Sequence, residues 1–174
     1  LMDVKMVMPF YYQGELWCFL SNTGPWPDTG GMVPGGFNSA ATEIQQEGLR
    51  LPPVKLMSAG ELQQDVVDII LNNIRVPDER IGDIRAQIGA LKTGEKRLTA
   101  LLDRYGADTV ASAITELRNR SEHHMREVIS AITDGTYGFT AYIDSDGVID
   151  EPLAIVLDLT IAGSDAHFDF SRSS

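Results

Sequence analysis

The sequence predicts an α+β fold with an N-terminal β-hairpin and Gly/Pro-rich loop, central antiparallel helices and C-terminal antiparallel β-strands. Three observations favour this class. Both ends of the 174-residue chain carry short β-type runs separated by glycine-containing turns. The middle carries two long stretches whose apolar residues recur every three or four positions. Between the first β-type runs and these stretches, a segment crowded with glycine and proline excludes a helix or a central strand.

The first element is a hairpin formed by residues 4–12 and 15–22, with Gln13-Gly14 as its turn. Its nearly continuous apolar run is typical of strands that are buried on both faces. Residues 21–41 follow as the Gly/Pro-rich loop, and apolar side chains such as Trp26 and Phe37 indicate that it packs. A purely structural loop and a functional site are equally good interpretations of these residues.

The next segments are short. Residues 42–50 predict a helical turn that ends at Gly48, and residues 54–56 are consistent with a short strand. Ser58 and Glu61 have the spacing of a capping box, which predicts a helix over about 60–75. The apolar face of that helix would carry Leu62, Val66, Ile69, Ile70 and Ile74.

Two long helices are predicted over about 78–105 and 109–132, joined at Gly106 as an antiparallel hairpin. Asp108 is placed to cap the second helix. We expect Ile84, Ile88, Leu98 and Leu102 to be buried against Ile114, Leu117, Val128 or a neighbouring chain. An apolar stripe left exposed would promote dimers, so a homo-oligomer is one possible assembly.

The C-terminal part predicts three strands. Residues 137–142 and 153–161 alternate in polarity, and residues 166–170 return after a turn at 163–165. The expected organisation is one partial domain over 1–174, with hairpin and loop over 1–57, helices over 58–133 and strands over 134–174.

Composition limits the function classes. The net charge of -11 argues against binding a phosphate backbone, so no nucleic-acid partner is expected. No apolar run is long enough for a membrane span, and the N-terminus has no signal-peptide pattern, which favours a cytoplasmic protein. Cys18, the single cysteine, is interpreted as a small core residue. Because the chain starts at Leu1 within strand-like sequence, we interpret it as an internal fragment, with a processed complete protein as the alternative.

Three possible motifs favour ordinary structure. Asp144-Ser145-Asp146-Gly147 lacks the spacing of a calcium loop and is typical of a hairpin turn. His123 and His124 point about 100° apart on a helix, so they cannot share one metal ion and are expected on a solvated face. The glycines at 30–36 lack the Lys-Ser/Thr of a phosphate-binding loop, so no cofactor-binding residues are assigned.

Asp3 and Asp28 form the most interesting pair of acidic residues. One precedes the first strand of the hairpin and the other follows the second, so both belong to the same end of the hairpin. Two carboxylates there, beside a rigid loop, could bind a divalent cation through oxygen. The alternative is two solvated acidic residues.

Taken together, these segments resemble the hydantoinase B/oxoprolinase family over essentially the whole chain. The family includes N-methylhydantoinase B subunits, the C-terminal part of 5-oxoprolinase, and subunits of acetone and acetophenone carboxylases. The most specific string runs from Glu47-Gly48-Leu49-Arg50 to Pro52-Pro53-Val54-Lys55. The other segments that carry the resemblance are Trp26 to Gly35, Asn73-Ile74-Arg75-Val76-Pro77, Gly82 to Gln87, Arg104-Tyr105-Gly106, Asp134 to Tyr137 and Asp169-Phe170-Ser171.

The resemblance implies a metal site in which this chain is incomplete. Asp3 matches the Asp of a His-x-x-Asp motif whose His would fall before Leu1. Asp28 matches the Asp of a second such motif, Gly30 and Gly31 match its glycines and support the loop, and Pro25 stands at its His. A divalent metal (Mn, Zn or Mg) is implied for the family, and we expect an empty or weakly occupied site here. Catalytic residues are not assigned.

The resemblance also implies a function. The family's A-type subunit or domain binds ATP and activates an amide, lactam or ketone, and the B-type subunit then completes the reaction. This chain would be a fragment of the B-type subunit of an ATP-dependent hydrolase of cyclic amides, partnered by an A-type subunit and inactive alone. Two alternatives stay open, namely a fragment of a ketone carboxylase subunit and a catalytically silent structural or interaction fragment.

Overall fold

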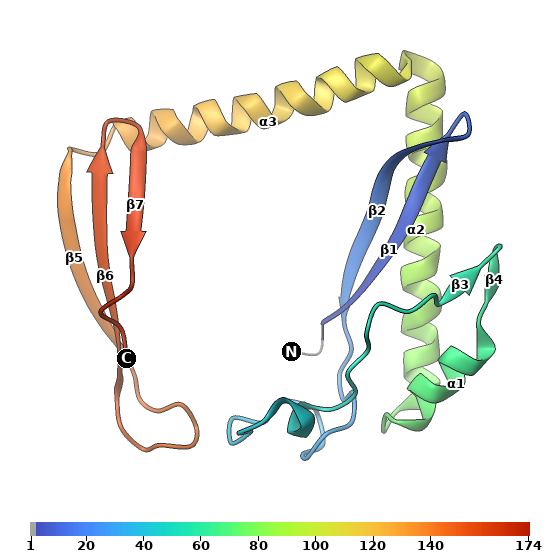
Figure 1. The fold of residues 1–174 in the computed structure, drawn as a ribbon, viewed down its shortest axis with the longest axis horizontal. Helices are drawn as coiled ribbons and strands as arrows, with labels where there is room; N and C mark the ends of the chain where they lie inside the picture. The colour runs from blue at the N-terminus through green and yellow to red at the C-terminus, as the bar shows by residue number, and fades with distance from the viewer. Residues whose placement is uncertain (1–2) are drawn as a thin grey trace. The chain divides into compact units, whose positions relative to one another are not determined.

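The computed structural model describes residues 3–174, which form two compact units, residues 3–100 and 101–174 (Figure 1). The first unit holds strands β1 (Asp3–Tyr12) and β2 (Glu15–Pro25), the 3₁₀ helix η1 (Ile44–Glu47), strands β3 (Met57–Ser58) and β4 (Glu61–Leu62), helix α1 (Gln64–Asn72) and most of helix α2 (Pro77–Tyr105). The second unit holds helix α3 (Ala107–Ser130) and strands β5 (Gly135–Ile143), β6 (Leu153–Ala162) and β7 (Asp165–Asp169). The α+β class, the N-terminal hairpin and the C-terminal antiparallel strands are therefore confirmed.

One face of the β1–β2 hairpin forms the core of the first unit. Met6 and Phe10 point inward and are buried, whereas Val7 and Tyr11 on the opposite face are exposed. The expectation that these strands are buried on both faces is wrong, because only one layer of the unit covers this two-stranded sheet.

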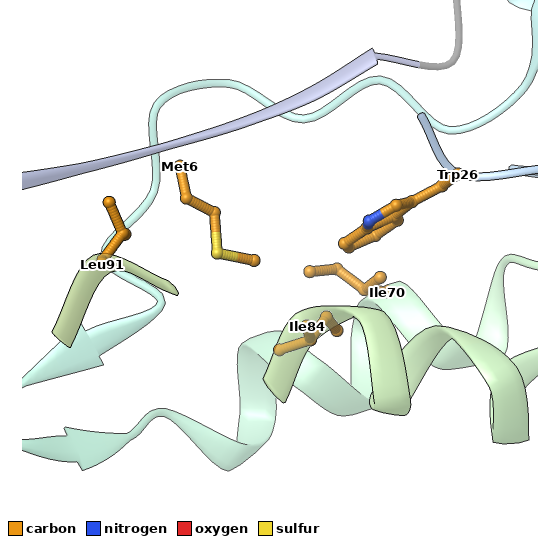
Figure 2. Close-up of a cluster of buried hydrophobic side chains, with 5 residues drawn as sticks. All are labelled: Met6, Trp26, Ile70, Ile84 and Leu91. Carbon is orange, nitrogen blue, oxygen red and sulfur yellow. The ribbon is translucent and has the colours of Figure 1, made fainter. Parts of the chain in front are cut away.

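The hydrophobic cluster of this unit joins residues far apart in the chain. Figure 2 shows Met6 of β1 and Trp26 after β2 beside Ile70 of α1, with Ile84 and Leu91 of α2 completing the cluster. Ile84 is fully buried and Trp26 is 2% exposed. The cluster therefore holds the end of β2, where the glycine-rich loop starts, against both helices.

A buried amide side chain joins the hairpin to α2. Gln87 accepts a hydrogen bond from the indole N–H of Trp26 at 2.9 Å, and its Nε2 donates to the Val4 carbonyl at 3.0 Å. Gln87 Nε2 also donates to Asn22 Oδ1 at 3.2 Å, and Asn22 Nδ2 donates back to the Gln87 carbonyl at 2.8 Å. This network satisfies a buried amide and sets the direction in which the chain leaves β2.

The start of α1 differs from its prediction. Ser58 and Glu61 pair across the short β3–β4 hairpin, and α1 begins at Gln64 without a side-chain cap. The capping-box interpretation is wrong, because Ala59 and Gly60 both have positive φ and turn the chain back on itself. On α1, Val67 and Ile70 are buried, whereas Ile69 is 60% exposed. The predicted turn before Gly48 is confirmed as η1.

Of the predicted stripe on α2, Ile84 and Leu102 are buried, as expected, whereas Ile88 and Leu98 are half-buried. Ile84 lies in the cluster with Met6 and Trp26 of its own unit. Packing of this stripe against α3 stays a prediction. An apolar stripe of period 3.6 indicates which face of a helix tends to be buried, but it does not identify the partner. Gly106 ends α2 with a positive φ as predicted, whereas Asp108 lies in the first turn of α3 without capping it.

The second unit contains an antiparallel sheet in the order β5-β6-β7. Tyr137 of β5 pairs with Leu159 of β6, which pairs with Phe168 of β7. The salt bridge from Arg126 to Asp165, 2.7 Å long, ties α3 to the first residue of β7. Among residues 3–174, no helix combines the length and apolar character that a membrane span requires.

Candidate functional site

Asp28 organises the loop that follows β2. It has a positive φ of 58° and is only 8% exposed. Its Oδ1 accepts hydrogen bonds from Gly30 N at 3.2 Å and Arg75 Nη1 at 2.7 Å, and its Oδ2 accepts one from Gly35 N at 2.9 Å. The carboxylate therefore holds both ends of the glycine-rich turn, and we call residues 28–36 the Asp28 loop.

Arg75 completes this arrangement from the segment between α1 and α2. Its Nη2 donates to the Gly31 carbonyl at 2.6 Å and its Nη1 also donates to the Val33 carbonyl at 3.3 Å. One guanidinium thus binds a carboxylate and two backbone oxygens of the same loop, which suits the fixed fork of arginine. Because its side chain is 39% exposed, the ion pair with Asp28 is partly screened by water.

Two of the glycines are needed because other backbone segments approach closely. Gly30 and Gly31 have φ near +88°, and a Cβ at either position would lie 2.6 Å from a carbonyl oxygen, that of Asn73 or Gln46 respectively. Hydrogen bonds from Met32 N to the Gln46 carbonyl and from Leu49 N to the Thr29 carbonyl, both 2.8 Å, fasten the loop to η1 and to the residues that follow it. The part of the loop near Gly30 and Gly31 is therefore packed and Trp26 is buried, as predicted, whereas Phe37 is exposed and does not contribute to the packing.

The hydrogen bonds of Asp28 have an electrostatic consequence. The backbone N–H of Gly35, followed by Arg75 and the N–H of Gly30, lowers the pKa of the Asp28 carboxyl against the opposing effect of burial. Asp28 is thus held as a carboxylate at neutral pH. Its charge is compensated within the protein, so it is poorly suited to act as a general base.

Asp3 lies at the same end of the hairpin as Asp28, as the sequence predicted. It is exposed, and in the register of the sheet it pairs directly with Pro25. Directly opposed residues have Cβ atoms about 4.5–5.5 Å apart. The residue that stands at the family's histidine position therefore faces Asp3 across the hairpin.

The donors in this region do not by themselves suit a divalent cation. Asp28 already accepts three N–H groups, and the guanidinium of Arg75 would repel a cation at its Oδ1. Within residues 3–174, no three His, Cys, Asp or Glu side chains gather as a metal-binding group. Metal binding by Asp3 and Asp28 stays a prediction.

A shallow pocket of about 330 Å³ lies beside the Asp28 loop. Its lining comes from the loop, from the residues around η1 and from the end of α1, namely Gly31, Gln45, Gly48, Leu49, Arg50 and Asn73. Most of these residues fall within the segments that carry the family resemblance. Part of the resemblance therefore surrounds this pocket in the first unit.

Sequence reasoning missed the roles of Arg75 and Gln87. Both stood in quoted family segments, but nothing local showed that they reach back across 47 and 61 residues to the end of β2. Two other interpretations agree with the structure, whereas the short strand predicted over 54–56 lies at Met57–Ser58 instead. Asp146 accepts the N–H groups of Val148 and Ile149 in a turn, and His123 and His124 are exposed.

Comparisons with known proteins point to one family. Residues 1–174 match the model of the family described as hydantoinase B/oxoprolinase. The beta subunit of the caprolactamase of Pseudomonas jessenii is 41% identical over 96% of this chain and 29% of its own. The B subunit of a putative D-/L-hydantoinase of Pseudomonas sp. (strain NS671) is 36% identical over 99% of this chain and 30% of its own.

A more distant relative and a solved structure extend this result. The acetophenone carboxylase delta subunit of Aromatoleum aromaticum is 29% identical over 84% of this chain and 22% of its own. The crystal structure of an ATP-dependent caprolactamase from Pseudomonas jessenii superposes with a TM-score of 0.89, at 40% identity over 96% of this chain and 29% of that one. The present chain thus spans less than a third of the length of these proteins.

Proposed function

Because the chain belongs to the hydantoinase B/oxoprolinase family, we propose that it forms part of the B-type subunit of an ATP-dependent enzyme that hydrolyses a cyclic amide. The observation that carries this proposal is the 41% identity to the beta subunit of a caprolactamase over 96% of the chain. The matched solved structure is an ATP-dependent caprolactamase, which supports the same class.

Amide-ring hydrolysis is favoured over ketone carboxylation by the pattern of similarity. Identity is 41% and 36% to the caprolactamase and hydantoinase subunits, against 29% over a smaller part of the chain to the acetophenone carboxylase subunit. Carboxylation of a ketone is the second candidate, since all three proteins match the same region.

The proposal includes a division of labour between subunits. ATP would be bound by an A-type subunit or domain, because this chain has no glycine-rich loop with the lysine that holds nucleotide phosphates. The chain would supply part of the surface on which the activated substrate is converted to product. We place this surface at the Asp28 loop and the pocket lined by Gly31 and Arg50.

The Asp28 loop would act by positioning. With its carboxylate bound to Arg75 and two backbone N–H groups, Asp28 keeps the loop in one conformation. A preorganised backbone holds a reacting group without paying for its ordering during the reaction. A purely structural role for the whole chain is the remaining alternative, favoured by Pro25 at the position of the family's histidine.

A chimeric enzyme tests the proposed class. Residues 1–174 would replace the matching region of the caprolactamase beta subunit of Pseudomonas jessenii, and ATP consumption would be measured with caprolactam, a hydantoin, 5-oxoproline and acetophenone. We expect stimulation by a cyclic amide. Stimulation by the ketone alone would contradict amide-ring hydrolysis, and an assembled chimera that no substrate stimulates would favour a structural role.

A further inference from the structure

The pocket of about 330 Å³ in the first unit is lined by a positive charge and by no negative one. Among its described lining residues, Arg50 carries the one charge and none is Asp or Glu. Gln45 and Asn73 add neutral amides, and Gly31 and Gly48 bring backbone to the surface. Because charges beyond about 8 Å are largely screened at physiological salt, this local charge decides what the pocket attracts, despite the net charge of -11.

The guanidinium of Arg50 is not occupied by the protein. The side chain is exposed, and among residues 3–174 no hydrogen bond or ion pair involves it. Arg75 differs, because its guanidinium is bound to Asp28 and to the Gly31 carbonyl. Arg50 therefore keeps its N–H donors for a ligand, and their planar fork matches the oxygens of a carboxylate or a phosphoryl group.

The backbone that lines the pocket is held in one conformation. Gly48 has a φ of +116°, and a Cβ there would lie 2.6 Å from the Thr29 carbonyl oxygen, which accepts a hydrogen bond from Leu49 N. Among residues 3–174, the N–H groups of Gly31 and Gly48 have no hydrogen-bond acceptor. Two backbone donors of the lining are thus left to bind water or an oxyanion, on a wall that needs little ordering when a ligand binds.

We propose that this pocket is an oxyanion subsite, in which Arg50 binds the carboxylate or the phosphoryl group that arises during ring opening. The choice of anion rests on the proposed function. Water that cleaves the C–N bond of a cyclic amide leaves its oxygen on the carbonyl carbon as a carboxylate, and the nitrogen becomes an amine. ATP consumed by the same enzyme is the source of a phosphoryl group. The volume lies at the lower end of the range of about 300–1,000 Å³ that small-molecule pockets have.

Amide chemical shifts of the isotope-labelled complete chain would measure this binding by NMR. The titrants are 6-aminohexanoate, which is ring-opened caprolactam, the uncharged-end analogue 6-aminohexanamide, and inorganic phosphate. We expect saturable shifts of Gly31, Gly48 and Leu49 with at least one anion, a dissociation constant below about 10 mM, and at least about tenfold weaker binding of the amide. Binding of 6-aminohexanoate alone assigns the subsite to the product carboxylate, and binding of phosphate alone assigns it to the phosphoryl group. Shifts with neither anion, or equal affinity for the amide, would overturn the proposal.

Matched variants assign the binding to Arg50. Arg50→Gln removes the charge and the fork, and should raise the dissociation constant of the bound anion at least about tenfold. Arg118→Gln removes the same charge from an exposed arginine that lines a shallow pocket on α3, and should change the constant less than about twofold. Because both arginines are exposed, the circular dichroism of each variant should match that of the parent. Unchanged binding by Arg50→Gln, or equal weakening by Arg118→Gln, would overturn the assignment.

The titration separates this inference from the proposed function, because it involves neither ATP nor turnover. A chimera that opens an amide ring while the complete chain binds no anion would refute the subsite and leave the function in place. An assembled but inactive chimera, with Arg50-dependent anion binding in the complete chain, would refute the role in ring opening and leave the anion site in place.

Discussion

Replacing Asp28 with Asn tests whether the carboxylate holds the loop after β2. Asn keeps the shape of the side chain but turns one oxygen into an NH₂ group. The least costly orientation points this NH₂ at Gly35 N, and keeps an oxygen towards Gly30 N and Arg75. Gly35 is exposed, so its N–H can be hydrated instead. The variant therefore loses the hydrogen bond from Gly35, and the bonds from Gly30 and Arg75 no longer go to a charged acceptor. Together these changes should lower the free energy of unfolding by about 2 kcal/mol.

Urea unfolding followed by tryptophan fluorescence would measure this loss, since Trp26 is buried two residues before Asp28. Asp144→Asn, at an exposed position, is the matched control and should change stability by less than about 0.5 kcal/mol. A loss below about 0.5 kcal/mol for Asp28→Asn, or an equal loss in the control, would refute the reasoning.

The pH dependence provides a second test of the same variant. The pKa of Asp28 is lowered in the folded protein, so its ionised form contributes stability above its unfolded pKa of about 3.9. That contribution is lost as the pH falls through the lower folded pKa. The stability difference between the parent and Asp28→Asn should therefore be constant near neutral pH and shrink below about pH 4.

Ile84→Ala, in the core cluster, should lower the free energy of unfolding by about 2–5 kcal/mol in chemical denaturation. Leu117→Ala, at an exposed position on α3, should lower it by less than about 0.5 kcal/mol, and similar losses in both variants would contradict the burial of Ile84. Gly31→Ala should destabilise the protein by at least about 1 kcal/mol more than Gly35→Ala in thermal unfolding, because both have positive φ but only Gly31 approaches a carbonyl oxygen; the reverse order would contradict this packing. Pro25→His should place an imidazole opposite Asp3 and raise the affinity for Zn²⁺ in calorimetric titrations at least about tenfold over Pro25→Ala, and equal affinities would count against a shared metal site there.

Local sequence predicted where helices and strands begin and end more reliably than it predicted what they pack against. The two ends of α2 were predicted by Pro77 and Gly106, because proline is favoured in the first turn of a helix and a glycine with positive φ ends one. Ser58 and Glu61 led to the wrong prediction of a capped helix, because their spacing also fits a tight hairpin in which Ala59 and Gly60 form the turn. Periodicity identified the apolar stripe of α2, but which surface covers Ile84 depends on contacts with distant parts of the chain.

At the candidate site, too, local features were predictable and long-range contacts were not. The placement of Asp3 and Asp28 at one end of the hairpin was predictable, because strand pairing brings the two ends together. The saturation of Asp28 was not, since Arg75 lies 47 residues further along the chain and no local pattern links them. Long-range polar contacts of this kind are decided by the tertiary fold, and here they show that Asp28 holds a loop.

The turnover of caprolactam by the chimeric enzyme is the most direct test of the proposed function. The rate of ring opening would be compared between the native caprolactamase and the chimera carrying residues 1–174, after both are shown to assemble with their partner subunit. At 41% identity over the matched region, we predict that the chimera keeps at least about a tenth of the native rate, a barrier increase of no more than about 1.4 kcal/mol. An assembled chimera with no measurable ring opening would contradict the claim that this chain supplies a working part of an amide-ring hydrolase.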